Sequence, residues 1–243
     1  MARVIPARRS RWRGALALLI ILVVAAGVGW LYVRDVRSQQ PAAAPPAGSV
    51  APGNPAYDAA RRQLEDLPIK SWDRVQDFSR VRFGEPWSDD VNVEFGHNGC
   101  NTRDDILRRD LVDVQVRSGT CFAQRGILHD PYTGQTIAFV RGPDSSSAVQ
   151  IDHVVSLSDA WYKGARSWDD QRRRDFANDP RNLLAVGAQA NFDKAFRDAA
   201  AWVPPNSAFR CEFVARQIEV KTDYQLWVSA REKDAMRRVL RDC

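Results

Sequence analysis

Residues 149–157 read VQIDHVVSL, a run rich in β-branched residues around an Asp-His pair. Such residues favour extended structure, so the run predicts a strand that carries Asp152 and His153 and then enters a polar loop. The chain has three histidines, and we expect His97 and His129 to be structural or surface residues. An Asp-His pair on a strand can be purely structural, so the residues that follow decide whether the pair belongs to a functional site.

The segment downstream adds polar residues in a recognisable order. Asn182 precedes a short apolar stretch at 183–186 that predicts a second strand, and residues 189–201 predict a helix. Asn191 and Lys194 are three residues apart, so they share one face of that helix. A strand bearing Asp-His, a strand preceded by Asn and a helix bearing a polar ligand form the order of a ββα-metal finger. In that arrangement one divalent ion lies between strand and helix.

Around this core, at about residues 149–201, the sequence predicts mostly helix with few, short strands. Helices are expected at residues 57–66, 103–112, 167–176, 209–220 and 222–241, and strands at 126–128 and 135–140. We therefore expect an α+β fold, with a ββα-metal finger embedded in a mostly helical domain that spans residues 57–243.

A membrane segment is expected before this domain. Residues 15–33 (ALALLIILVVAAGVGWLYV) form a run of 19 without a charge, roughly long enough to cross a bilayer as a helix. Five arginines in residues 1–14 place that terminus in the cytoplasm. We favour an uncleaved signal anchor that exports the domain, and the alternative is a cleavable signal peptide, which would release it. Residues 34–56, rich in Pro and Ala, predict a linker.

The net charge of +5 does not describe the exported domain. Residues 1–37 contain seven of the 35 basic and one of the 30 acidic residues, which leaves 28 basic and 29 acidic residues in the remainder. A nearly neutral domain argues against tight, extended binding to nucleic acid, and any basic surface must be local.

The four cysteines are Cys100, Cys121, Cys211 and Cys243, and they lack the close C-x-x-C spacing of a zinc site. In an exported domain an even number of cysteines favours disulfides. Of the three possible pairings we favour Cys100–Cys121 with Cys211–Cys243, because each encloses a local loop. Zinc binding by the four thiolates is the alternative.

The sequence resembles the HNH endonucleases, in particular exported, actinobacterial-type, DUF1524-like proteins related to the C-terminal domain of GmrSD restriction endonucleases. The resemblance covers about residues 98–236 and lies in the order and spacing of motifs that are individually weak. These motifs are GCNTR at 99–103, LRRD at 107–110, GTC at 119–121, DPYTG at 130–134, IDHVVSL at 151–157, AW at 160–161, GA at 164–165, FANDP at 176–180, NLL at 182–184, Asn191 with Lys194, Trp202 with PP at 204–205, and Lys221 with Tyr224.

The resemblance implies phosphodiester hydrolysis assisted by one Mg²⁺ or Mn²⁺ ion. Asp152 and Asn191 are implied as its oxygen ligands, and the amide of Asn191, where many HNH enzymes have His, favours these metals over Zn²⁺. His153 is implied as the general base that takes a proton from the attacking water, and Asn182 as a residue that holds the loop by hydrogen bonds. In a regular strand Asp152 and His153 point to opposite faces, so a single site requires the strand to bend or end there.

Two basic residues are candidates for binding the substrate phosphate. Lys194 is one, because an ammonium binds phosphate as a point charge, and its alternative role is that of a solvated helix lysine. Arg103 is the other, because Cys100 would tether it beside the finger. The alternative for Arg103 is an ion pair with Asp104 or Asp130.

Together these features predict a metal-dependent endonuclease that hydrolyses extracellular DNA, or RNA, with little sequence specificity. We expect it to be a monomer and to contact the membrane through residues 15–33. The competing hypothesis is a catalytically inactive HNH-fold protein that binds nucleic acid or an envelope partner. A hydrolase of cell-wall polymers is disfavoured, because we find no paired-carboxylate signature in the sequence.

Overall fold

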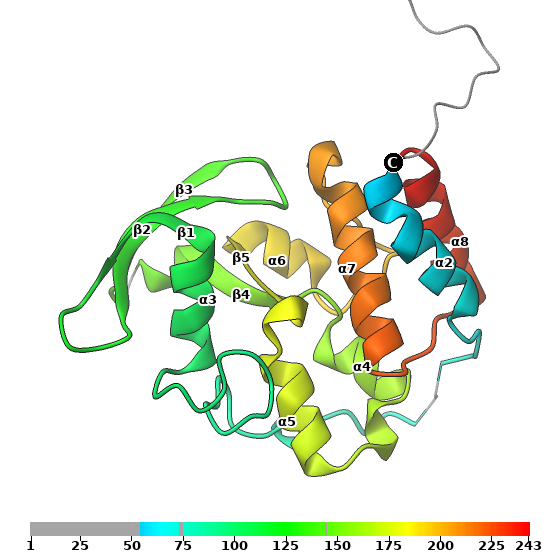
Figure 1. Ribbon diagram of the computed structural model, residues 1–243, viewed down its shortest axis with the longest axis horizontal. Coiled ribbons are helices and arrows are strands. Elements are labelled where there is room, and N and C mark those ends of the chain that lie inside the picture. Colours follow the sequence, from blue (N-terminus) through cyan, green and yellow to red (C-terminus); the bar gives the residue numbers. More distant parts are fainter. Residues whose placement is uncertain (1–53, 73–74, 144) are drawn as a thin grey trace, which may run out of the picture. The chain divides into compact units, whose positions relative to one another are not determined.

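The computed structural model describes residues 54–243 except residues 73–74 and 144, and this part of the chain has the predicted α+β fold (Figure 1). Its helices are α2 (Asp58–Asp66), α3 (Thr102–Asp110), α4 (Leu157–Tyr162), α5 (Asp170–Asn178), α6 (Ala188–Lys194), α7 (Arg210–Asp223) and α8 (Ala230–Arg241). Its strands are β1 (Leu111–Val116), β2 (Ala123–His129), β3 (Thr136–Val140), β4 (Val149–His153) and β5 (Leu183–Gly187).

The predicted membrane segment at 15–33, the basic terminus before it and nearly all of the linker lie outside the described residues. Within the part that is described, no helix combines the length and the apolar character needed to cross a bilayer.

Strands β4 and β5 form an antiparallel pair in which Asp152 lies opposite Leu184 and His153 lies opposite Leu183. Helix α6 follows β5 directly and packs on both strands. The predicted order of strand, strand and helix is therefore present, with α4 and α5 inserted between the two strands.

Both faces of the β4–β5 pair are buried, which explains the continuous apolar run of β5. On one face Val149 and Leu183 belong to a core cluster with residues of α3, β2 and β3. On the other face Leu184 and Val186 belong to a cluster with residues of α2, α7 and α8, three helices that pack against one another (Figure 1). A polar side chain on either face must therefore find hydrogen-bond partners inside the protein.

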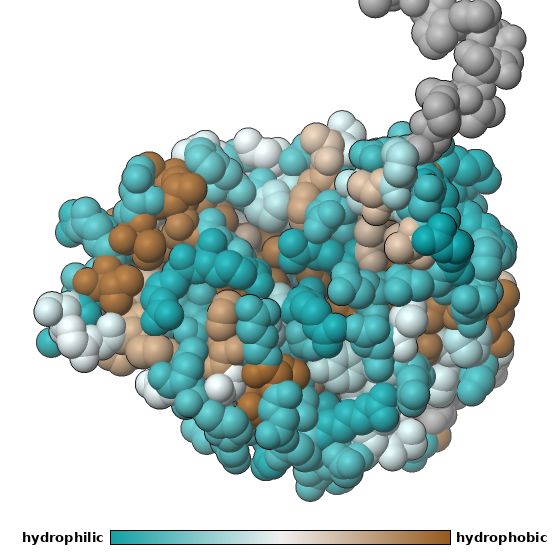
Figure 2. Space-filling view, in the orientation of Figure 1, coloured by the Kyte–Doolittle hydropathy of each residue, from teal (hydrophilic) through white to brown (hydrophobic). Residues whose placement is uncertain are grey.

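Strands β1, β2 and β3 form a separate antiparallel sheet. Exposed apolar residues such as Val112, Val116 and Val140 belong to it, and Figure 2 shows hydrophobic residues gathered at this end of the domain. Strand β1 corrects the prediction of a helix up to residue 112. Helix α3 ends at Asp110, because the alternating sequence LVDVQV that follows pairs with β2.

Two other predicted elements end earlier than expected. The strand predicted over 149–157 ends at His153, and Ser156 then caps α4 by accepting a hydrogen bond from the Asp159 backbone N–H. The helix predicted over 189–201 ends at Lys194, because Ala195 has a φ of 49°, which a right-handed helix does not continue.

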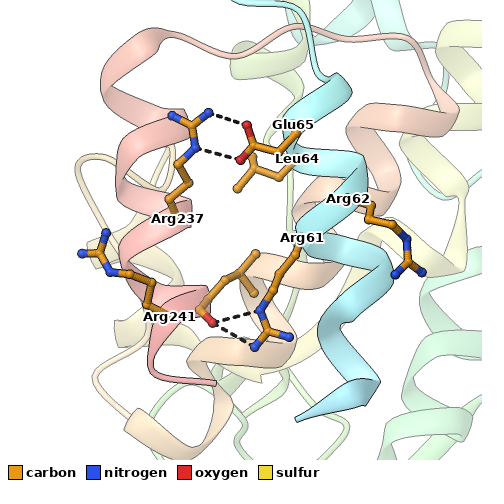
Figure 3. A pocket seen from close by; sticks show the side chains of 7 residues that line it. Arg61, Arg62, Leu64, Glu65, Arg237 and Arg241 are labelled. Atoms are coloured by element: carbon orange, nitrogen blue, oxygen red, sulfur yellow. Dashed lines mark hydrogen bonds and ion pairs between the residues drawn. The ribbon is translucent and has the colours of Figure 1, made fainter. Parts of the chain in front are cut away.

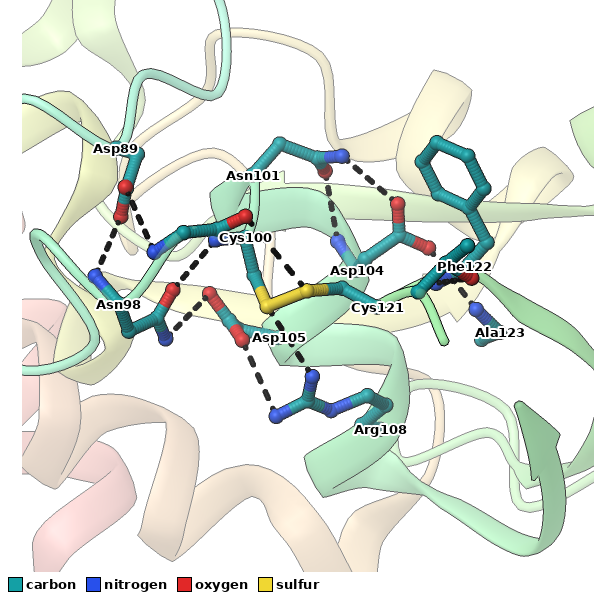
Figure 4. Close-up of a disulfide and its surroundings, with 12 residues drawn as sticks. Asp89, Asn98, Cys100, Asn101, Asp104, Asp105, Arg108, Cys121, Phe122 and Ala123 are labelled. Atoms are coloured by element: carbon teal, nitrogen blue, oxygen red, sulfur yellow. Dashed lines mark hydrogen bonds and ion pairs between the residues drawn. A yellow bond between two sulfur atoms is a disulfide. The ribbon is translucent and has the colours of Figure 1, made fainter. Parts of the chain in front are cut away.

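The predicted disulfides Cys100–Cys121 and Cys211–Cys243 are both present, so the zinc alternative is wrong. Cys100–Cys121 joins the segment before α3 to the segment before β2, and next to it Asn101 caps α3 by accepting from the Asp104 N–H (Figure 4). Cys211–Cys243 joins the first turn of α7 to the C-terminal residue.

We expect each disulfide to stabilise the fold by restricting the unfolded chain. The cysteines are 21 and 32 residues apart, and loops of these lengths correspond to about 3–4 kcal/mol each. Urea unfolding of the Cys100→Ser/Cys121→Ser and Cys211→Ser/Cys243→Ser variants should show losses of this size. A loss below about 1 kcal/mol in both variants would contradict the expectation.

Candidate active site at the end of β4

Asp152 and His153 are the last two residues of β4, and they point to opposite sides of the β4–β5 pair. The side chain of Asp152 contacts Lys194 of α6, whereas that of His153 contacts Ala177 of α5. Only 5% of Asp152 and 7% of His153 is exposed. Pairing with β5 continues through His153, so the bend that would bring both side chains to one side is not seen.

The carboxyl group of Asp152 is fully engaged with two buried side chains. The hydroxyl of Tyr132 donates to Oδ2 at 2.6 Å, and the Lys194 ammonium lies 3.0 Å from both carboxyl oxygens. Burial raises the pKa of Asp152, and Lys194 and Tyr132 oppose this change. The pKa of Tyr132 is raised well above its usual value by burial and by the charge of Asp152, so its hydroxyl remains a donor.

Lys194 is fully buried at the end of α6 and also donates to the carbonyl oxygen of His153 at 2.8 Å. Its ammonium therefore does not reach the surface as a solvated lysine would. In this structure Lys194 is a counter-ion for Asp152 and a support for the backbone of His153.

Asn191 lies one turn earlier on the same face of α6. Its amide donates to Gln150 at 2.7 Å, so Asn191 is opposite Gln150 just as Lys194 is opposite Asp152. In this arrangement both oxygens of Asp152 are engaged by Lys194 and Tyr132, and the side-chain N–H group of Asn191 is engaged by Gln150. Metal binding by Asp152 and Asn191 stays a prediction. Across the described residues, no group of three or more His, Cys, Asp or Glu side chains is placed to hold a metal ion.

Asn182 holds the turn that follows His153. Its side-chain oxygen accepts from the Val155 N–H at 2.8 Å, its amide donates to the Val155 carbonyl, and its own carbonyl accepts from Val154. This is the loop-holding position that the family resemblance implies for Asn182.

The imidazole of His153 is held in one orientation and one protonation state. Nε2 lies 2.8 Å from the carbonyl oxygen of Ala177, and because a carbonyl only accepts, Nε2 carries the proton and Nδ1 does not. The ring of Trp87 is stacked on the imidazole, with centroids 5.9 Å apart and planes 13° apart. Burial lowers the pKa of His153 to about 3; the Ala177 hydrogen bond opposes this, and the charges of Arg80 and Lys194 add to it. His153 is thus a neutral imidazole with an unprotonated nitrogen.

A small pocket of about 20 Å³ lies beside His153. Its lining includes Arg80, Glu85, Trp87 and Ala177. A volume of this size corresponds to roughly one water molecule. A neutral imidazole next to such a pocket can act as a general base.

Arg103 does not line this pocket. Its guanidinium donates to the carbonyl oxygens of Ser146 and Val149, where it supports the start of β4. Burial lowers its pKa. Neither a phosphate-binding position nor an ion pair with Asp104 or Asp130 is seen.

Several residues that shape the site were not predicted from the sequence. Tyr132 lies in the quoted motif DPYTG, but nothing local indicated that its hydroxyl binds Asp152. Arg80 and Trp87 lie before the region of resemblance. A buried network in which Lys163 and Lys221 pair with Asp159 and Glu232 was also unexpected.

A larger pocket of about 440 Å³ lies between α2 and α8, and most of its lining side chains are basic (Figure 3). Arg237 is paired with Glu65, and Arg61 donates to the carbonyl oxygen of Leu240. No histidine, cysteine or hydroxyl group lines this pocket. Of these two pockets, only the smaller one is lined by a histidine, His153.

The model of the family "GmrSD restriction endonucleases, C-terminal domain" matches residues 101–239. A curated relative from Arthroderma benhamiae, named "Uncharacterized secreted protein", is 36% identical over 194 residues, which is 79% of this chain and 88% of the relative. No solved structure matches the chain. The matched family region contains Asp152, His153, Asn182, Asn191 and Lys194, whereas Arg80 and Trp87 precede it.

The lowered pKa of His153 should appear in the pH dependence of stability. The unfolded histidine titrates near 6.5 and the folded one near 3, so the unfolded state binds more protons between these values and stability falls as the pH drops through this window. Between pH 7 and pH 5 the free energy of unfolding should fall by about 2 kcal/mol more in the wild type than in His153→Gln. Urea unfolding at both pH values measures this. His129→Gln, at an exposed histidine, should keep the wild-type slope, and an equal slope in His153→Gln would contradict the assignment.

Loss of the Lys194 charge should be costly because it leaves Asp152 buried without a counter-ion. We expect Lys194→Met to lower the free energy of unfolding by about 3–5 kcal/mol. Arg197→Met, at an exposed residue just beyond α6, is the matched control and should cost below about 1 kcal/mol. Urea unfolding of the wild type and of both variants measures these losses, and equal losses in the two variants would contradict the counter-ion role of Lys194.

Proposed function

The chain belongs to the family of C-terminal domains of GmrSD restriction endonucleases, and we propose on this premise that it hydrolyses phosphodiester bonds of DNA or RNA with His153 as the general base. Membership supports a nuclease-related function and a nucleic-acid substrate.

The observation that carries the proposal is the state of His153. Its Nε2–H is bound to Ala177, so Nδ1 is the nitrogen that can accept a proton. In the proposed step a water beside the imidazole transfers a proton to Nδ1 as its oxygen forms a bond to phosphorus. The bond from phosphorus to the leaving oxygen breaks in line, that oxygen takes up a proton from solvent water, and the imidazolium returns its proton to solvent.

The face of β4 opposite to His153 supports this step without touching substrate. Lys194 is paired with Asp152, which also accepts from Tyr132, and it donates to the His153 carbonyl, while Asn182 holds the next turn. We assign positioning roles to these residues. The requirement for Mg²⁺ or Mn²⁺ stays a prediction of the family resemblance, because Asp152 and Asn191 are bound to Lys194 and Gln150 here.

The proposed place of action is outside the cytosol. Two disulfides fit an oxidising compartment, and the matched relative is named a secreted protein. The apolar run at 15–33 would either anchor the domain to the membrane or be cleaved to release it. The substrate would then be extracellular nucleic acid.

A second candidate function is that of a catalytically inactive binding protein. It is favoured by one observation, the ion pair between Asp152 and Lys194, which leaves no open carboxylate for a metal. The two candidates differ in whether cleavage occurs at all.

Cleavage of supercoiled plasmid and of a single-stranded RNA, with Mg²⁺, with Mn²⁺ and with EDTA, tests the proposal. We expect cleavage that falls about 10²–10⁴-fold in His153→Ala, because general base catalysis contributes about that factor. His129→Ala should cleave at the wild-type rate. Near wild-type cleavage by a folded His153→Ala would falsify the role of His153, and a folded wild type that cleaves neither substrate would support the binding protein.

A further inference from the structure

The wall of the pocket beside His153 comes from outside the matched family region. Residues 80–87, which include a short 3₁₀ helix at Arg80–Phe83, provide most of the lining, whereas the family match begins at residue 101. This segment, called the 80–87 wall below, is therefore a part of the site that belongs to this chain and is not covered by the family description.

The 80–87 wall is firmly attached to the domain. Phe83 is buried against Trp161 and Phe176, with ring centroids 6.1 Å apart in both pairs. The Arg173 side chain donates to the Arg82 carbonyl at 2.9 Å, and the Trp87 carbonyl accepts from the Thr102 N–H. These contacts, at Arg82, Phe83 and Trp87, hold the backbone of the segment beside His153.

Gly84 allows the close approach of the wall to α5. It has a φ of +84°, and a Cβ at this position would lie 2.5 Å from Cγ of Arg174. Any other residue at this position would have to adopt an unfavourable left-handed backbone, and its Cβ would clash with Arg174.

Arg80 is the cation at this pocket that is free to meet a substrate. The two sequence-predicted phosphate ligands are occupied, Lys194 by Asp152 and Arg103 by backbone carbonyls. Arg80 is exposed, lines the pocket with His153 and has no ion-pair partner among the described residues. Its charge is close enough to contribute to lowering the pKa of His153.

We propose that Arg80 binds the phosphate of the substrate at the mouth of the His153 pocket, with the 80–87 wall positioning it. The inference rests on the proposed function. A guanidinium offers two parallel N–H groups that match a pair of phosphate oxygens. The pocket itself holds about one water, so the phosphate lies outside it, between the exposed guanidinium and the imidazole.

Glu85 is the opposing charge at the same pocket. Its carboxylate repels a phosphate, so it weakens binding and favours release of the product, which carries an additional negative charge after hydrolysis. Substitutions of Arg80 and of Glu85 should therefore change the affinity for substrate in opposite directions. A merely structural role of the 80–87 wall would not produce opposite effects.

The test uses the full chain and measures both cleavage and binding of a short fluorescent duplex DNA, with binding followed by fluorescence anisotropy in EDTA. We expect Arg80→Gln to raise KM and Kd about tenfold to hundredfold with a smaller change in kcat, and to reduce the slope of log Kd against log salt by about 0.9. Arg80→Lys should keep most of the salt slope. Glu85→Gln should lower KM and Kd.

Arg82→Gln is the matched control, since Arg82 is exposed on the same 3₁₀ turn but does not line the pocket. It should behave as the wild type. Equal Kd, KM and salt slope in Arg80→Gln and Arg82→Gln would overturn the inference. Wild-type cleavage, and thus the proposed function, would not be affected by that result. A folded wild type that binds the duplex without cleaving it would instead count against the proposed function, and the Arg80→Gln binding data would still decide the role of Arg80.

Discussion

The buried carboxyl group of Asp152 is the constraint on which the arrangement of the site depends. A carboxyl group removed from water requires a counter-charge and hydrogen bonds, and these come from Lys194 and Tyr132. Lys194 ends α6 and Tyr132 lies in the turn between β2 and β3, so one group joins a helix and a turn to β4. Since Lys194 also binds the His153 carbonyl, the position of the proposed base depends on the same ammonium.

The other fully buried lysines follow the same principle. Lys163 and Lys221 pair with Asp159 and Glu232, and they join α4 to α7 and α8. Burial raises the pKa of Glu232, and the two ammonium groups are among the charges that oppose this. Because these three lysines serve as internal counter-ions, they contribute nothing to a positive surface. Among the described residues the exposed cations are therefore mostly arginines, and the contacts to the proposed anionic substrate would come mainly from them.

Features that depend on neighbours in the sequence could be predicted, and features that depend on distant partners could not. The apolar run of β5 and the cysteine spacing correctly indicated a strand and two disulfides. The end of α6 at Lys194 depends on the left-handed backbone of Ala195, which has no sequence signal for a non-glycine residue. The alternation of side chains along a strand already predicted that Asp152 and His153 point to opposite faces. The residues that each of them contacts could not be predicted, because these partners are distant in the sequence. The position of the 80–87 wall could not be predicted, because its contacts with α5 join residues that are distant in the sequence.

A base with a pKa of about 3 is weak, and this bears on how the proposed reaction proceeds. General base catalysis is most effective when the pKa of the base is near the working pH. In the free protein, burial lowers the pKa of His153, and the charges of Arg80 and Lys194 contribute. A phosphate bound at Arg80 would offset the charge of that guanidinium and place a negative charge beside the imidazole, and both effects favour the protonated ring and raise its pKa. The substrate would thus strengthen the base that acts on it, and water beside an empty site would remain unactivated.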